Sequence, residues 1–158
     1  MNPHDGKHTA SGDAASDVTI RKAVSGDSVP VQVLMSTYFL DIEGLPIDEF
    51  IVALLGERII GAAYLQTGKI TEIHSVAVHP NYRGKGIGHM LLYALLSQVK
   101  DVDFIFTRTT SPVFFEKAGF KKLDDSEKAV LWEDCAGCDR LNTCKQSVLR
   151  LDIRYKGR

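Results

Sequence analysis

The sequence predicts an α/β or α+β domain that is built on a mixed sheet. Short strand-like runs, some alternating and some continuously apolar, are interleaved with segments whose apolar residues recur at helical spacing. Three strand-like runs follow one another closely, whereas later ones are separated by helices, so hairpins and crossover connections occur together. The length of 158 residues fits one domain, which we expect to span residues 18–158.

Local signals define the elements in the first half of the chain. Residues 18–23 alternate between apolar and polar side chains and predict a strand. Asp27 or Ser28 is a suitable N-cap for the helix that follows. Gly56-Glu57 separates two apolar runs and predicts a tight turn between strands. The other expected strands cover residues 50–55, 59–66 and 70–78.

The second half of the chain contains a strongly periodic helix. Between Ile87 and Val99 the apolar residues recur three or four positions apart. Ser111 is a suitable cap for a brief helix that ends at Gly119. Short strands are expected at residues 103–107, 121–123, 130–132 and 148–153.

The first 17 residues predict a disordered tail. They contain no Val, Ile, Leu or aromatic residue, so burial cannot offset the entropy of ordering them. His4 and His8 are accordingly interpreted as solvated residues and not as metal ligands.

The balance of charge argues against two classes of partner. The chain has 19 Lys and Arg against 20 Asp and Glu, a net charge of −1. Nucleic-acid-binding proteins normally show a basic excess, and surface anchors need a polybasic segment, so neither a nucleic-acid nor a membrane partner is expected. Net charge is −5 over residues 1–79 but +4 over residues 80–158, so the second half can receive an anion.

Cysteine usage and hydropathy predict a cytoplasmic protein. The apolar stretches are too short for a membrane-spanning helix, and the N-terminus has no secretory apolar region. The three cysteines, Cys135, Cys138 and Cys144, are an odd number within ten positions, which is not a secreted disulfide framework.

The most specific feature is a glycine-rich loop between a predicted strand and the periodic helix. It reads Arg83-Gly84-Lys85-Gly86-Ile87-Gly88 and is followed by His89. The first N–H groups of a helix lack internal partners and, with the helix dipole, form an anion site. The loop therefore suits pyrophosphate, although it matches neither a P-loop nor a Rossmann fingerprint.

The loop resembles that of the GNAT acetyltransferase superfamily, whose signature is Arg/Gln-x-x-Gly-x-Gly/Ala after a strand. Arg83, Gly86 and Gly88 match that signature, and residues 75–83 and 114–120 are similar to further family segments. The resemblance implies a mostly antiparallel central sheet flanked by helices and splayed between its two central parallel strands.

The same resemblance implies where acetyl-CoA binds. Its pantetheine arm would pair with the backbone of Val76, Ala77 and Val78. The pyrophosphate would lie on residues 83–88, with help from His89. Phe115 would be a core or cofactor-contact aromatic; many family members have a Tyr there to protonate the leaving thiolate. Tyr93, Ser111 or water remain alternative donors.

The family resemblance assigns Glu72 as the candidate general base. It lies eleven residues before Arg83, where several members carry a catalytic glutamate. His74 shares the face of Glu72 in a regular strand and is a rival base. The alternative is that Glu72 is an exposed strand residue.

The acceptor is expected to be a primary amine of a small molecule or peptide. Residues 40–49 contain four acidic and no basic side chains, which favours a cationic amine. Residues 107–120 and 132–138 are nevertheless similar to N-acetylglutamate synthases, so glutamate is an alternative acceptor. A non-catalytic CoA-binding module is the other alternative.

The cysteine-containing segment 132–145 is a candidate structural zinc site. Cys135, Cys138 and Cys144 supply three thiols, whereas a structural zinc needs four ligands. Asp134, Asp139 or a distant His would have to complete the site. Free thiols or one disulfide are the alternatives, and a metal- or redox-sensing role would depend on these residues. Because the fold often dimerises, residues after Gln146 are candidates for a homodimer contact.

Overall fold

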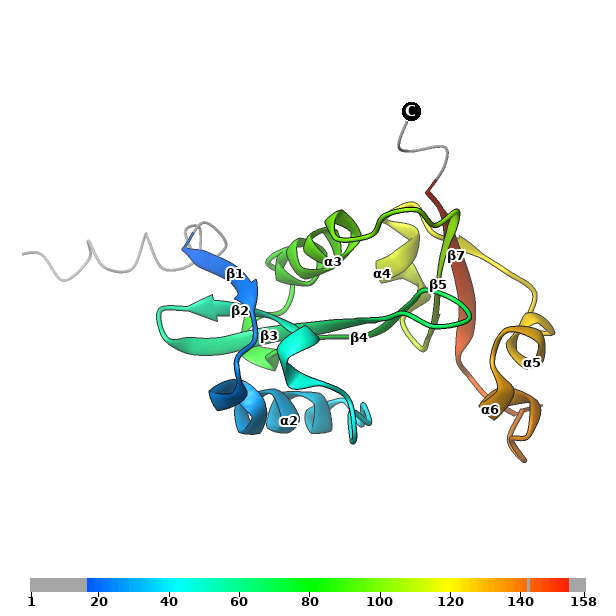
Figure 1. The fold of residues 1–158 in the computed structure, drawn as a ribbon, viewed down its shortest axis with the longest axis horizontal. Coiled ribbons are helices and arrows are strands. Elements are labelled where there is room, and N and C mark those ends of the chain that lie inside the picture. Colours follow the sequence, from blue (N-terminus) through cyan, green and yellow to red (C-terminus); the bar gives the residue numbers. More distant parts are fainter. Residues whose placement is uncertain (1–16, 142, 154–158) are drawn as a thin grey trace, which may run out of the picture. The chain divides into compact units, whose positions relative to one another are not determined.

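The computed structural model of the protein describes residues 17–141 and 143–153 (Figure 1). Its strands are β1 (Val18–Lys22), β2 (Ile51–Leu55), β3 (Arg58–Gln66), β4 (Glu72–Val78), β5 (Phe104–Thr109), β6 (Lys121–Lys122) and β7 (Ser147–Asp152). Its α-helices are α2 (Ser28–Thr37), α3 (Ile87–Ser97), α4 (Pro112–Glu116), α5 (Glu127–Leu131) and α6 (Glu133–Ala136). Short 3₁₀ helices cover Ser25–Asp27, Ile47–Glu49 and Pro80–Tyr82.

The strands follow the order β1-β2-β3-β4-β5-β7-β6. β4 and β5 are parallel, whereas β2 pairs antiparallel with both β1 and β3, and β7 pairs antiparallel with both β5 and β6. The predicted fold class, a mixed and mostly antiparallel sheet with helices, is therefore confirmed.

The chain forms two compact units. The first contains the residues up to Leu65 and Ser75–Val99; the second contains Gln66–His74 and the residues from Lys100 onward. Strand β4 is divided between them after His74. The expectation of one domain over residues 18–158 stays a prediction.

In the first unit, α2 and α3 cover opposite faces of the strands (Figure 1). The helical spacing of Val31, Leu34 and Met35 places these residues on one side of α2, where they are buried in a cluster with alternate residues of β2 and β3. Val29 and Val33 of α2 are apolar but exposed, so the apolar residues of this helix extend beyond the face that is buried.

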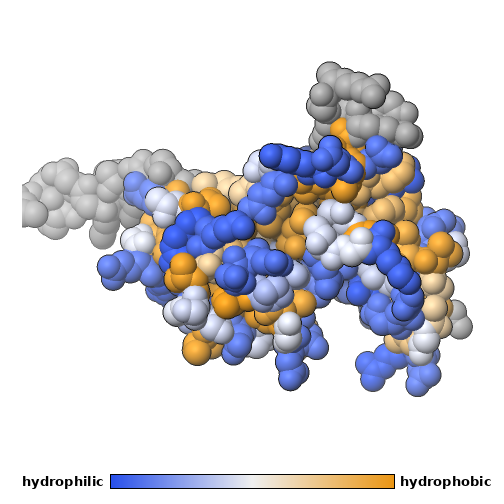
Figure 2. All heavy atoms as spheres, in the orientation of Figure 1, coloured by the Kyte–Doolittle hydropathy of each residue, from blue (hydrophilic) through white to orange (hydrophobic). Residues whose placement is uncertain are grey.

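The surface is mixed in character. On the face drawn in Figure 2, hydrophobic and hydrophilic residues are both exposed. Isolated apolar side chains on a surface are normal in folded proteins. None of the described helices is long and apolar enough to cross a membrane.

The second unit is organised by β5 and β7, which pair antiparallel along six residues of each strand. The start of β4 joins β5 in parallel, with Glu72 opposite Phe106. A small core of Trp132, Cys135 and Val148 lies in this unit, with Phe106 among the side chains packed against it. This core fixes the segment that follows α5.

One strand prediction is wrong. Residues 130–132 were expected to form a strand, but Val130 and Leu131 belong to α5, and the N–H of Trp132 donates to the carbonyl of Lys128 at 3.0 Å. A three-residue apolar run fits the end of a short helix as well as a strand, because periodicity cannot distinguish them at that length. The other expected strands and helices form, with ends that differ by a few residues.

The predicted tail of residues 1–17 lies, except for Asp17, outside the described residues, as do His4 and His8.

Candidate active site

The glycine-rich loop forms the N-terminal end of α3 in the first unit. Gly84 and Gly86 have φ values of 77° and 83°, a region that L-residues with a Cβ avoid. No atom lies within 4 Å of where a Cβ would stand at either position. Backbone conformation, and not lack of space, therefore requires glycine in this loop.

The N-terminus of α3 is suited to an anion. The N–H of Met90 donates to the carbonyl of Gly86 at 3.1 Å, so the N–H groups of Ile87, Gly88 and His89 precede the first helical hydrogen bond. The first turn contains no acidic residue. Its electrostatics therefore favour negative charge.

Arg83 and Lys85 add positive charge to the loop. The Arg83 side chain is exposed, and its guanidinium carbon lies 5.8 Å from the centre of the Tyr38 ring. The Tyr38 hydroxyl donates a hydrogen bond to the carbonyl of Val78. Tyr38 thereby connects the end of α2 to the end of β4 and supports Arg83 beside the loop.

Burial alternates along β4. Ile73, Ser75 and Ala77 are buried, whereas His74, Val76 and Val78 are half-buried. The predicted pantetheine-binding residues Val76 and Val78 are thus the more accessible ones, and the side chain of Ala77 belongs to the core. Ile87 is also buried, which leaves only its backbone N–H for a ligand.

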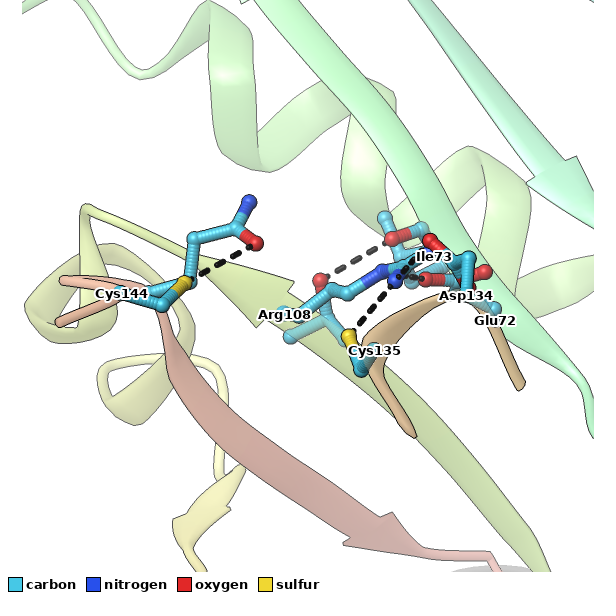
Figure 3. A network of polar contacts seen from close by, with 8 residues as sticks. Glu72, Ile73, Arg108, Asp134, Cys135 and Cys144 are labelled. Atoms are coloured by element: carbon cyan, nitrogen blue, oxygen red, sulfur yellow. Dashed lines mark hydrogen bonds and ion pairs between the residues drawn. The ribbon is translucent and has the colours of Figure 1, made fainter. Parts of the chain in front are cut away.

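Glu72 is a buried carboxylate in the second unit. Only 6% of its side chain is exposed, so it is not an exposed strand residue. Arg108 Nε donates to Glu72 Oε2 at 3.3 Å (Figure 3). Burial raises the pKa of the Glu72 carboxyl, and the nearby Arg108 charge opposes that rise without cancelling it. A carboxyl with a raised pKa is a stronger base, as proton transfer requires.

Arg108 lies at the centre of a polar network. Its Nη1 donates to Asp134 Oδ2 at 2.8 Å and to Cys135 Sγ at 3.1 Å (Figure 3). Its guanidinium carbon lies 4.8 Å from the centre of the Trp132 ring. Residues from the segment around α6 therefore converge on Arg108, which in turn contacts Glu72.

Trp132 contributes a polar group to the same region. Its Nε1 is buried and has no hydrogen-bond partner of normal geometry among the described residues. The indole N–H nevertheless lies near enough to Glu72 to lower the pKa of that carboxyl, which burial raises more strongly. Trp132 is the one buried side chain in the described residues whose N–H lacks a partner.

Phe115 lies in an aromatic cluster of the second unit. It is 5% exposed, and its ring centre is 5.0 Å from that of Phe114 and 5.4 Å from that of Phe120. This packing matches the interpretation of Phe115 as a core aromatic. Contact with the cofactor stays a prediction.

The three cysteines are not gathered into one site in the part of the chain that the structure describes. Cys135 is buried beside Arg108, Cys138 is exposed, and Cys144 lies apart from Cys135 with its thiol directed to Gln146 (Figure 3). No three His, Cys, Asp or Glu side chains within residues 17–141 and 143–153 converge to hold a metal ion. Sequence spacing suggested zinc, but Cys135 packs into the small core and points to Arg108 instead.

The acidic segment 40–49 borders a pocket in the first unit. The pocket has a volume of about 320 Å³, and its lining includes Asp41 and Glu43 together with apolar Leu40, Ile47 and Phe50. Both acidic side chains are exposed. The pocket has room for a small amine-bearing group and supplies negative charge at its edge.

Arg108 and Trp132 were not predicted as site residues, and Asp134 was considered only as a possible fourth ligand of the candidate zinc site. One signal could have identified Arg108. Side chains alternate between the two faces of a strand, so Arg108 lies on the same face of β5 as Phe104 and Phe106 and is the charged residue beside two aromatic ones. Trp132 and Asp134 had no such signal, because their placement depends on a helix that was expected to be a strand.

Comparisons with known proteins agree with this architecture. A family model for an acetyltransferase (GNAT) domain matches residues 46–122. An uncharacterized N-acetyltransferase of Chlorobaculum tepidum is 33% identical over 109 residues, which cover 65% of this chain and 70% of the relative. An amino-acid acetyltransferase of Mycobacterium tuberculosis is 30% identical over 120 residues, covering 66% of this chain and 69% of the relative.

The chain therefore belongs to the GNAT acetyltransferase family and is by class an N-acetyltransferase.

Solved structures share the fold. N-acetylglutamate synthase from Neisseria gonorrhoeae, complexed with coenzyme A and N-acetyl-glutamate, superposes with a TM-score of 0.70 at 22% identity. That match covers 85% of this chain and 35% of the synthase, so this chain spans about a third of its length. A Mycobacterium tuberculosis protein in complex with CoA has a TM-score of 0.68 at 24% identity, with 85% and 98% covered.

Proposed function

We propose that this protein transfers the acetyl group of acetyl-CoA directly to a primary amine of a small molecule or peptide. The observation that carries the proposal is a buried carboxyl, Glu72, at the start of the strand that leads into an anion-binding helix N-terminus. One continuous segment thus supplies a base and a phosphate site. A cytoplasmic location and a homodimer stay predictions of the sequence.

The loop would hold the pyrophosphate of acetyl-CoA. Arg83 and Lys85 provide charge, and the N–H groups that precede the first helical hydrogen bond of α3 provide directed donors. The backbone of Val76 to Val78 would pair with the pantetheine arm. The carbonyl of Val78 accepts the Tyr38 hydroxyl, so this carbonyl is already engaged within the protein.

Glu72 would take a proton from the acceptor ammonium, directly or through a water molecule, to leave a neutral amine. The amine nitrogen then bonds to the thioester carbonyl carbon, the carbon–sulfur bond breaks, and CoA leaves as a thiolate. The nitrogen loses its second proton to water as the amide forms. A backbone N–H near Val76 or Ala77 would stabilise the oxyanion. His74 remains a rival base, and Tyr93, Ser111 or water remains the donor to the thiolate, whose ordinary pKa of about 8.5 permits unassisted departure.

The test is a panel of amines assayed for release of CoA thiol. We expect Glu72→Gln to lower turnover about 100-fold or more, the scale of general-base catalysis, while acetyl-CoA binding measured by calorimetry is retained. Glu57→Gln, an exposed glutamate in the β2–β3 turn, is the matched control and should keep full activity.

Two outcomes would contradict the proposal. Unchanged turnover by Glu72→Gln would remove Glu72 as the base. Binding of acetyl-CoA without thiol release for any amine would favour the non-catalytic CoA-binding module.

Glutamate or another amino acid is the second candidate acceptor. It is supported by the amino-acid acetyltransferase relative, by the synthase that shares the fold, and by Arg108, a cation beside Glu72 of the kind that binds carboxylates. The acidic pocket bordered by Asp41 and Glu43 favours a cationic amine instead. The amine with the highest kcat/KM in the panel decides between them.

A further inference from the structure

The guanidinium of Arg108 is shared between two carboxylates of very different exposure. The Glu72 side chain is 6% exposed and the Asp134 side chain is 70% exposed. Arg108 lies closer to the exposed partner, at 2.8 Å from Asp134 Oδ2 against 3.3 Å from Glu72 Oε2. The shorter contact of this arginine is therefore made with the exposed carboxylate.

Arg108 would affect the basicity of Glu72 differently if its guanidinium were not shared with Asp134. A guanidinium can donate two parallel hydrogen bonds to one carboxylate, and such a pair strongly favours the ionised form. That arrangement would make Glu72 a weaker base. Here only Nε contacts Glu72, whereas Nη1, at the other end of the guanidinium, donates to Asp134 and to the thiol of Cys135.

The other groups around Glu72 do not share the Arg108 guanidinium as Asp134 does. The indole ring of Trp132 lies against the guanidinium, and its N–H faces the same region without a normal hydrogen bond. His74 is two residues away on β4 itself. Among the charged groups acting on Glu72, Arg108 comes from β5 and Asp134 from α6.

We propose that Asp134 is a positioning residue for Glu72: by holding Nη1, it fixes the Arg108 guanidinium in the orientation in which Nε alone contacts Glu72, and so keeps that carboxylate basic. The proposal rests on the proposed function of Glu72 as the base. Asp134 acts through Arg108 and contacts no reacting atom. Its own charge works in the same direction, because a second negative charge near Glu72 raises the pKa of that carboxyl.

The test is a titration of Glu72 in the full chain. Glutamate side chains are labelled with ¹³C at the carboxyl carbon, and the Glu72 signal is identified by its absence in Glu72→Gln. In Asp134→Asn we expect Glu72 to titrate at lower pH than in the wild type. The CoA thiol-release rate at neutral pH should fall by about three- to tenfold, because a weaker base transfers the proton less efficiently.

Glu133→Gln is the matched control. It removes the same charge one residue earlier in α6, from a side chain that is 87% exposed and pairs with Lys69. Its Glu72 titration should equal that of the wild type. A melting temperature measured for each variant separates loss of folding from a change at the site.

The outcomes separate the two proposals. If Glu72→Gln loses turnover but Glu72 titrates at the wild-type pH in Asp134→Asn, the role of Asp134 is overturned and the proposed base stands. If Glu72→Gln keeps full turnover, the proposed base and the positioning role fail together.

Discussion

At the scale of single residues, burial decides what each acidic side chain can do. Glu72 and Asp27 are both buried, but their partners differ. Around Glu72 the loss of water outweighs the favourable charge of Arg108, and the pKa of the carboxyl rises. Asp27 accepts hydrogen bonds from Arg21 and from the Val24 N–H, and these lower the pKa of its carboxyl despite burial. The Glu72 carboxylate is thereby suited to proton transfer, and the Asp27 carboxylate is suited to stabilising the fold.

Asp27 is expected to make stability depend on pH. Because its pKa is lowered from 3.8, the carboxylate stabilises the fold fully above pH 3.8, and this contribution is lost as the pH falls below 3.8 through the lowered value. We expect Asp27→Asn to lower the free energy of unfolding by about 1–2 kcal/mol at neutral pH. Urea unfolding at several pH values measures this.

The difference between wild type and Asp27→Asn should shrink below pH 3.8. Asp48→Asn, which changes an exposed carboxylate, is the control and should have no measurable effect at either pH. A difference for Asp27→Asn that stays constant at all pH values would contradict the assigned hydrogen bonds.

At the scale of elements, the sequence predicts helices and strands reliably where a segment is long or where specific turn residues mark its ends. The apolar spacing of α3 continues for three turns, and Gly56-Glu57 fits a two-residue turn between β2 and β3. The error at residues 130–132 arose because three apolar residues are too few to show a period. The small core around Trp132 and Cys135, which is formed by residues distant in sequence, decided the structure there.

The loop before α3 gives a test at this scale. Gly86→Ala places a Cβ on a residue with φ of 83°, which costs about 1–2 kcal/mol or forces the backbone to move. Because the N–H groups that follow would be redirected, we expect acetyl-CoA to bind about tenfold more weakly by calorimetry. Gly26→Ala is the control, since Gly26 has no positive φ and no atom within 4 Å of its Cβ position. Equal affinities of the two variants would refute the loop assignment.

At the scale of the whole molecule, the net charge of the chain hides a difference in charge between the two halves of the sequence. The net charge of −1 argued against nucleic acid, but Arg83 and Lys85 lie in the basic half of the sequence, and Glu72 and the acidic segment 40–49 lie in the other half. The proposed function combines an anionic cofactor with a cationic amine, and so it needs both signs of charge. A nearly neutral sum is the consequence.

A measurement of the metal content of the whole protein tests whether the three cysteines bind zinc. Protein purified without a histidine tag should contain no stoichiometric zinc by elemental analysis, because the described residues bring no three suitable ligands together. A chelator should leave the melting temperature unchanged. One zinc ion per chain would contradict this expectation and restore Cys135, Cys138 and Cys144 as candidate ligands.

The sequence by itself determined the fold class, because periodicity and turn residues are local signals, and its motifs indicated the family through their resemblance to known members. The cofactor loop and Glu72 as the base stay predictions that this resemblance implies. Only the tertiary structure decided how Glu72 is partnered. Arg108 and Asp134 lie 36 and 62 residues after it, and no local pattern connects them. Burial and charge act through space, so the strength of a base is a property of the folded chain.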